Sequence, residues 1–163
     1  MIKLYLKIVL ALVLVPISVV ADEHSHNHQT QLIELLVYKT PTCGCCKKWI
    51  SHIEAQGIVA FSKDYQNIDG IKEHLEIQPN HRSCHTAVTK NGFVFEGHVP
   101  AKFIKKFLNE SHSTAIGLSV PAMPLGSPGM EVGDRFMPYN ILIMYKDGSS
   151  EIYASLQTYQ EQF

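Results

Sequence analysis

"TAVTKNGFVFEG", residues 86–97, is the stretch of sequence that decides the fold. Two strand-like segments flank Asn91-Gly92, a dipeptide that favours the positive φ angles of a two-residue turn. The stretch therefore predicts two antiparallel strands joined by a tight hairpin.

The segments on either side of this hairpin alternate between strand and helix patterns. The runs at 32–39 and 58–65 are of strand length, whereas 46–57 and 68–77 have helical spacing. A further amphipathic helix is expected at 100–110. A parallel strand pair with helical crossovers, closed by an antiparallel hairpin, is the thioredoxin-like arrangement. The predicted class is therefore α/β, with a thioredoxin-like central sheet flanked by helices.

The composition changes after Ser111. Residues 117–138 hold four prolines, four glycines and three methionines, and we find no helical or strand period in them. Residues 139–156 predict a second hairpin that turns at Asp147-Gly148. We interpret the chain from about residue 112 as a Gly/Pro/Met-rich loop and β-hairpin extension of one metal-binding domain spanning 32–163.

The first 21 residues have the pattern of a secretory signal peptide. Lys3 and Lys7 precede an apolar run, and small residues lead to a predicted cleavage site after Ala21. An uncleaved membrane anchor is the alternative. The apolar run is short for that role, because a membrane helix needs about 20 mostly apolar residues. Residues 22–31 form a polar, His-rich leader that we expect to be flexible. Cleavage predicts an exported, periplasmic protein without stable membrane insertion.

Charge argues against a nucleic-acid partner. The whole chain carries a formal net charge of −1, and losing the two lysines of the signal takes it to −3. A mildly acidic chain without a basic patch has no electrostatic reason to bind nucleic acid.

The four cysteines are the chemically distinctive residues. Cys43, Cys45 and Cys46 crowd the loop before the first predicted helix, and Cys84 stands just before the hairpin. In the predicted fold these two loops lie side by side, so the four thiols converge on one helix N-terminus. The partial positive charge there favours anions, which predicts lowered cysteine pKa values and available thiolates.

Two interpretations of these thiols remain open. In an exported protein four cysteines default to two disulfides, and here the pairs would be Cys43–Cys46, spaced like a redox dithiol, and Cys45–Cys84. Both disulfides would then cross-link the chain at the same place, which is an unusual way to stabilise a domain. We therefore favour a metal site. Soft thiolates select Cu(I), with zinc as the common competitor.

Methionines and histidines supply further candidate ligands. We favour Met130, in a Gly/Pro-rich turn, and His85 and His98, which are near the predicted site; His81 has weaker grounds. At least one of Met123, Met130 and Met137 is expected to fill the core, as is Met144. His52 and His74 are expected on helix surfaces and His112 in a loop.

Cleavage after Ala21 would create a second candidate copper site. The new N-terminus would be Asp22-Glu23-His24, whose amine, two amides and imidazole form a square-planar nitrogen set suited to Cu(II). His26 and His28 add ligand capacity.

Four motifs resemble the CopG-type family of small periplasmic proteins associated with copper resistance. These are "TPTCGCCKKW", "SCHTAV", "EGHVPA" and "GLSVPAMPLGSPGME", and the resemblance covers about residues 33–155. Ala122 departs from the glycine usual in the family, but no ligand is lost. The resemblance implies a thioredoxin-like fold with several copper ions bridged by Cys43, Cys45, Cys46 and Cys84, and redox activity on copper.

The sequence therefore predicts a periplasmic copper-binding protein for copper resistance. It would hold Cu(I) in a thiolate site and cycle copper between Cu(II) and Cu(I), a copper oxidoreductase activity with Cys43 and Cys46 as redox candidates. A copper-export or copper-chaperone protein is a further hypothesis for the partner. The alternatives are a passive copper carrier and a thiol-disulfide oxidoreductase, although no proline directly precedes Thr86.

Overall fold

The computed structural model of the protein describes residues 32–163. The predicted signal peptide, its cleavage site and the leader lie outside the described residues. So do the candidate ligands of the second site, Asp22, His24, His26 and His28.

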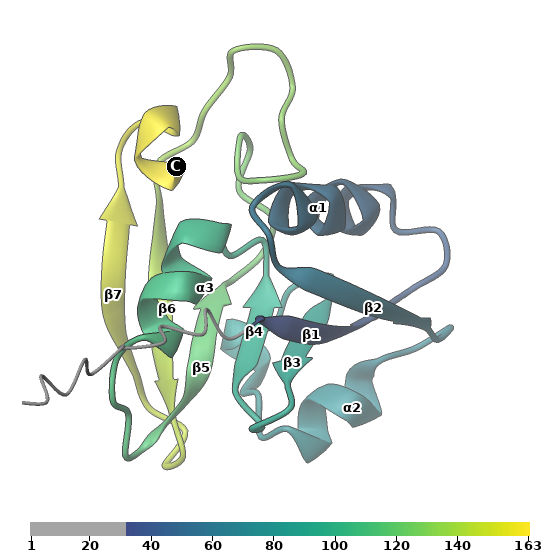
Figure 1. Ribbon diagram of the computed structural model, residues 1–163, viewed down its shortest axis with the longest axis vertical. Helices are drawn as coiled ribbons and strands as arrows, with labels where there is room; N and C mark the ends of the chain where they lie inside the picture. Colours follow the sequence, from purple (N-terminus) through teal and green to yellow (C-terminus); the bar gives the residue numbers. More distant parts are fainter. Residues whose placement is uncertain (1–31) are drawn as a thin grey trace, which may run out of the picture. The chain divides into compact units, whose positions relative to one another are not determined.

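The described residues form a mixed α/β structure around one seven-stranded sheet (Figure 1). The elements in chain order are β1 (Glu34–Lys39), α1 (Gly44–Ala55), β2 (Val59–Asp64), α2 (Asp69–His74), η1 (Pro79–His81), β3 (Thr86–Thr89), β4 (Val94–Gly97), α3 (Ala101–Leu108), β5 (Ala115–Val120), β6 (Tyr139–Tyr145), β7 (Ser150–Leu156) and η2 (Tyr159–Gln162).

The sheet has the order β2-β1-β3-β4-β5-β6-β7. β1 pairs with β2 in parallel and with β3 in antiparallel orientation, and β3 and β4 form the predicted hairpin. The predicted two-residue turn is wrong: the Thr89 N–H bonds the Phe93 carbonyl across three residues, Lys90, Asn91 and Gly92, and only Gly92 of these has a positive φ. β5 is parallel to β4, and β6 and β7 continue the sheet in antiparallel orientation. The second hairpin, turning at Asp147-Gly148, is also confirmed.

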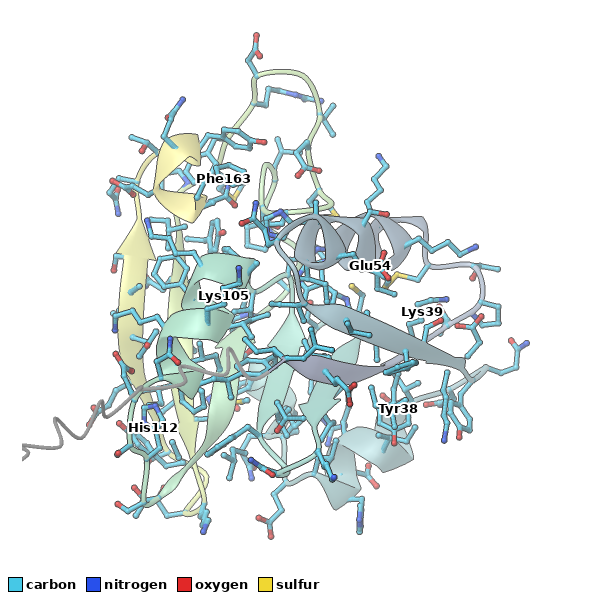
Figure 2. All side chains as sticks on the ribbon, viewed as in Figure 1. Tyr38, Lys39, Glu54, Lys105, His112 and Phe163 are labelled. Carbon is cyan, nitrogen blue, oxygen red and sulfur yellow. A yellow bond between two sulfur atoms is a disulfide. The ribbon has the colours of Figure 1, made fainter. Side chains whose placement is uncertain are left out.

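Helices cover the sheet on two faces. The main core joins Trp49 and Ile53 of α1 with Ile104 and Phe107 of α3 against the inward side chains of the sheet, such as Phe95. Successive strand residues point to opposite faces, so Val94 lies on the other side, where it packs with Ile77, which follows α2. Side chains fill the space between the sheet and the helices (Figure 2).

One prediction about the C-terminal region is wrong. Residues 117–138 were expected to lack a strand, but β5 begins at Ala115 and extends to Val120. Nearly all of β5 is buried, so it lacks the alternation that marks a half-exposed strand. Gly117 is required there, because a Cβ atom would come within 1.7 Å of the Val94 carbonyl oxygen on β4. The C-terminal strands therefore continue the sheet.

No helix within residues 32–163 has both the length and the apolar character needed to cross a membrane.

Two isoleucines test whether the C-terminal strands belong to the same folding unit. Ile141 of β6 is 0% exposed in the main core, whereas Ile152 of β7 is 61% exposed. We expect Ile141→Ala to lower the free energy of unfolding by about 2–5 kcal/mol, because it leaves a cavity. The matched control Ile152→Ala should change it by about 0.5 kcal/mol or less. Chemical denaturation followed by circular dichroism measures both; a separate early transition in Ile141→Ala would contradict a single unit.

Candidate metal centre

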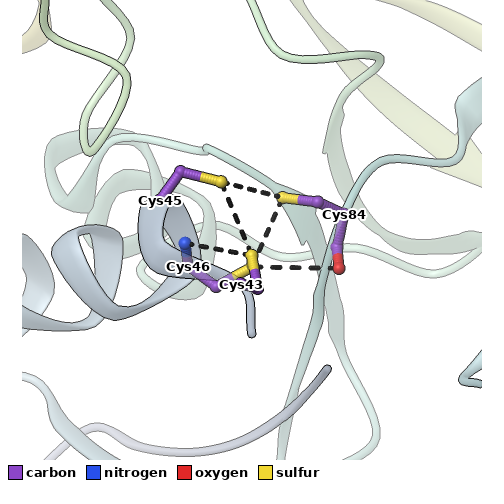
Figure 3. A group of neighbouring side chains, drawn as sticks. All are labelled: Cys43, Cys45, Cys46 and Cys84. Carbon is purple, nitrogen blue, oxygen red and sulfur yellow. Dashed lines mark hydrogen bonds between the residues drawn. A yellow bond between two sulfur atoms is a disulfide. The ribbon is translucent and has the colours of Figure 1, made fainter. Parts of the chain in front are cut away.

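The predicted convergence of the four cysteine side chains is confirmed. Their sulfur atoms all lie within 4.8 Å of one another. The Cys84 Sγ lies 3.5 Å from that of Cys46 and 4.0 Å from that of Cys45, and the Cys45 Sγ lies 3.5 Å from that of Cys43 (Figure 3). A cluster of sulfur atoms from two distant segments therefore stands at the start of α1.

Strand register brings these segments together. Tyr38, near the end of β1, is paired with Thr86, the first residue of β3. The chain leaving β1 and the chain entering β3 therefore lie at the same end of the sheet. Cys43 follows the first of these positions closely, and Cys84 precedes the second.

The start of α1 holds the first three cysteines. The Cys43 sulfur caps the helix by accepting the backbone N–H of Cys46 at 3.2 Å. Cys43 and Cys46 also form a disulfide, with Cα atoms 5.3 Å apart, while Cys45 and Cys84 are free. Of the two bridges that remained open from the sequence, the Cys43–Cys46 bridge is therefore present and Cys45–Cys84 is not.

The expectation of a lowered cysteine pKa is wrong for Cys84. Burial, together with the neighbouring Cys45, raises the pKa of the Cys84 thiol to about 12. The physical reason is that loss of hydration and the neighbouring Cys45 outweigh the hydrogen bonds of Ser83 and of the Cys84 backbone, which act in the opposite direction. At neutral pH Cys84 is therefore a protonated thiol, and a metal must displace its proton.

His98 presents a ring nitrogen to Cys84. Its Nδ1–H donates to the Pro128 carbonyl at 2.7 Å, which leaves a lone pair on Nε2, 3.1 Å from the Cys84 sulfur. Burial lowers the pKa of His98, so the imidazole stays neutral at neutral pH. Histidine ligands of metals characteristically donate their other N–H to a carbonyl in this way.

His85 lies on the other side of the same sulfur. Its Nδ1 is 3.3 Å from the Cys84 sulfur, and its ring lies against Trp49 with centroids 4.3 Å apart. Burial is the main cause that lowers the pKa of His85 well below its ordinary value, and the neighbouring His98 and Lys72 act in the same direction. Among the described residues, its Nε2 is the buried side-chain nitrogen or oxygen atom that lacks a hydrogen-bond partner. Such an atom is costly to bury and often marks a functional site.

Cys84, His85 and His98 thus form a second group of ligand atoms within 4.8 Å that shares Cys84 with the first group. Neutral imidazoles and thiolates together suit Cu(I) or Zn²⁺. Both histidines favoured from the sequence therefore lie at the site.

The connection between β5 and β6 braces the site from the C-terminal side. Gly129 packs so closely on α1 that a Cβ atom would lie 2.7 Å from both the Cys45 carbonyl oxygen and the Trp49 backbone nitrogen. Gln162 of η2 supports this loop by donating its side-chain N–H to the Gly126 carbonyl at 3.1 Å. Met130 follows Gly129 directly and is half-buried; its role as a ligand stays a prediction.

The predictions for the other methionines and histidines are only partly confirmed. Met144 is buried as expected, but Met123 and Met137 are exposed and Met130 is only half-buried, so none of those three fills the core. His74 is exposed and His112 lies in a loop, as expected. His81 is buried and bonds Ser150 instead of the site, and His52 is half-buried, accepting the Ala101 N–H at 3.2 Å.

Sequence reasoning missed two supporting residues, one within the last of the four motifs and one outside all of them. Pro128 orients His98 through its carbonyl group, and Gln162 braces the loop. Both act through tertiary contacts, so local pattern carries no signal for them.

The chain matches one family model and two solved structures. Residues 81–130 match a family model described as a protein of unknown function, DUF411; this range contains Cys84 but not the α1 cysteines. Two solved structures are similar, named copper resistance protein copG, form 1 and form 2. Each has a TM-score of 0.72 and 36% identity; the match covers 77% of this chain and 98% or 99% of the other chain. Among curated proteins no match is found.

The raised pKa of Cys84 predicts how this thiol reacts with an alkylating agent. With the Cys43–Cys46 disulfide intact, the alkylation rate of Cys84 should rise about tenfold per pH unit from about pH 8 to pH 11, since only the thiolate reacts. Peptide mapping by mass spectrometry measures the rate at each pH. Cys45→Ser should keep most of this behaviour, because burial is the larger cause. A rate that levels off near pH 9 in the folded protein would contradict the prediction.

Proposed function

The chain belongs to the CopG family of copper resistance proteins, and from this membership we propose that it binds copper through its cysteine thiolates and protects the cell envelope from the metal. The observation that carries the proposal is the convergence of four cysteine sulfurs, with the imidazoles of His85 and His98 beside one of them. Thiolates are soft ligands that suit both Cu(I) and Zn²⁺, so the family membership is what favours copper.

We also propose that the reduced site holds several copper ions bridged by sulfur. The sulfur separations of 3.5–4.0 Å support this arrangement. Two thiolates that share one tetrahedral ion at about 2.3 Å would lie about 3.8 Å apart. Four thiolates also offset the charge of several Cu(I) ions. Met130 remains a candidate for an additional ligand.

Redox activity on copper is a further part of the proposal, with the Cys43/Cys46 pair as its electron source. Oxidation of both thiols to the disulfide releases two electrons and two protons, and the electrons reduce two Cu(II) ions to Cu(I). A dithiol reductant would then restore the pair. The Cys43–Cys46 bridge supports this assignment, because it is the oxidised product of that reaction. A passive carrier would instead keep copper in one oxidation state.

A thioredoxin-like core fits this chemistry and also supports the rival function. The strand order β2-β1-β3-β4, with α1 and α3 on one face of the sheet, favours that arrangement for the first half of the chain. A thiol-disulfide oxidoreductase acting on proteins would use the same Cys43/Cys46 pair. Against it, His85 occupies the position before Thr86, where such enzymes usually carry a cis-proline.

The proposed compartment is the periplasm, reached through the predicted signal peptide, and the proposed recipient of Cu(I) is a copper-export or copper-chaperone protein. The N-terminal Cu(II) site with Asp22, His24, His26 and His28 depends wholly on cleavage after Ala21. Mass spectrometry of the exported protein decides this: a mature N-terminus other than Asp22 removes the second site.

A Cu(I) titration tests the thiolate site. We expect reduced protein, residues 22–163, to bind more than one Cu(I) per chain tightly against a competing chelator under anaerobic conditions. A variant with serine at all four cysteine positions should lose this copper and its thiolate-to-copper absorption. In cells the same variant should lose copper tolerance.

The opposite result also has a clear meaning. Two disulfides without cysteine-dependent copper, together with reduction of a disulfide substrate at useful rates in the absence of metal, would favour the oxidoreductase. Unchanged copper tolerance in the serine variant would contradict the protective role.

A further inference from the structure

A buried polar network lies next to the segment that carries Cys84 and His85. Its centre is Glu96 of β4, which is 0% exposed, with Lys72 of α2 at 2% exposed. The Glu96 Oε1 accepts hydrogen bonds from the Lys72 ammonium and from the backbone N–H of Ser83, the latter at 2.6 Å. The Oε2 accepts from the Thr86 hydroxyl, also at 2.6 Å. One carboxylate thus gathers donors from a helix, a strand and a loop.

Two of these donors flank the ligand-bearing residues. Ser83 directly precedes Cys84, and Thr86 directly follows His85. Gly97, next to Glu96 on β4, also donates its N–H to the His85 carbonyl at 2.9 Å. β4 therefore contacts the Cys84-His85 segment at three points: the Ser83 N–H, the His85 carbonyl and the Thr86 hydroxyl.

Stability alone does not explain this buried charge pair. Removing two charges from water is costly, and well-packed apolar residues often replace buried ion pairs without loss of stability. Burial raises the pKa of Glu96, while the Lys72 charge and the hydrogen bonds act in the opposite direction. Lys72 forms a salt bridge with Glu96, and charge-assisted hydrogen bonds are about twice as strong as neutral ones.

We propose that Glu96, supported by Lys72, is a positioning residue that holds the Cys84 sulfur in place among the other ligand atoms. Through Ser83 and Thr86 it fixes the segment so that this sulfur lies 3.5 Å from that of Cys46 and 3.1 Å from the His98 Nε2. The purpose of this positioning rests on the proposed copper function. The positioning itself concerns the thiols and can be tested without metal.

Two double variants separate positioning from the ion pair. In Lys72→Met/Glu96→Gln, the uncharged amide still offers an oxygen to the Ser83 N–H and an N–H to the Thr86 hydroxyl. In Lys72→Met/Glu96→Leu, the charge pair is equally absent, but Ser83 and Thr86 both lose their partner. The two variants have the same net charge, so they differ in the hydrogen bonds that hold the segment.

The readouts are Cu(I) affinity and the alkylation rate of Cys84 relative to Cys45 in metal-free protein at one pH. We expect the glutamine variant to resemble wild type in both. The leucine variant should lose about 10–100-fold in Cu(I) affinity, as other supporting residues of metal sites do, and its Cys84/Cys45 alkylation ratio should rise severalfold. A general loss of stability would not change that ratio in folded protein.

A third variant covers the case in which the leucine variant does not fold. Thr86→Val removes the hydrogen bond to Glu96 and the one that Thr86 accepts from Lys72 at 2.9 Å. It keeps the ion pair and the Ser83 bond, so it should shift both readouts in the same direction by a smaller factor. Equal alkylation ratios in wild type, Thr86→Val and any folded double variant would overturn the proposal. If wild type bound no cysteine-dependent copper, the copper function would fail, whereas the alkylation ratio would still decide the positioning role.

Discussion

The antiparallel pairing of β1 with β3 is the constraint on which the site depends. Its register sets Tyr38 opposite Thr86, so the chain leaves one strand and enters the other at the same place. Without this register, Cys84 would not meet the cysteines at the start of α1, 38 or more positions earlier in the chain. The hairpin pairing of β3 with β4 then brings Glu96 and His98 to the loop before β3. A backbone interaction thus determines side-chain chemistry.

The parts of the fold with strong local signals could be predicted from the sequence. Asn91-Gly92 and Asp147-Gly148 are specific to tight turns, and both hairpins form around them. β5 could not be predicted, because a strand buried on both faces shows no alternation and Gly117 lowers its strand propensity. Its glycine is needed for close approach to β4, a tertiary requirement that has no local pattern.

The candidate site shows the same division. The four thiols, His85 and His98 could be predicted because the hairpin and the order of elements determine which loops meet. The protonated state of Cys84 could not, since it depends on how much water the folded chain excludes around that sulfur. Nor could the role of Lys72 and Glu96: in the sequence they look like ordinary surface charges, and only the packing of α2 against the sheet buries them.

The contact between Gln162 and the Gly126 carbonyl has a consequence for the order in which the site can be assembled. During synthesis the chain emerges from its N-terminus, so the three crowded thiols appear long before Cys84 and longer still before Gln162. Until η2 has docked, the loop whose Pro128 carbonyl orients His98 lacks the hydrogen bond that Gln162 donates to it. The support of the His98 ring is therefore complete only once the C-terminal residues have been synthesised and have folded.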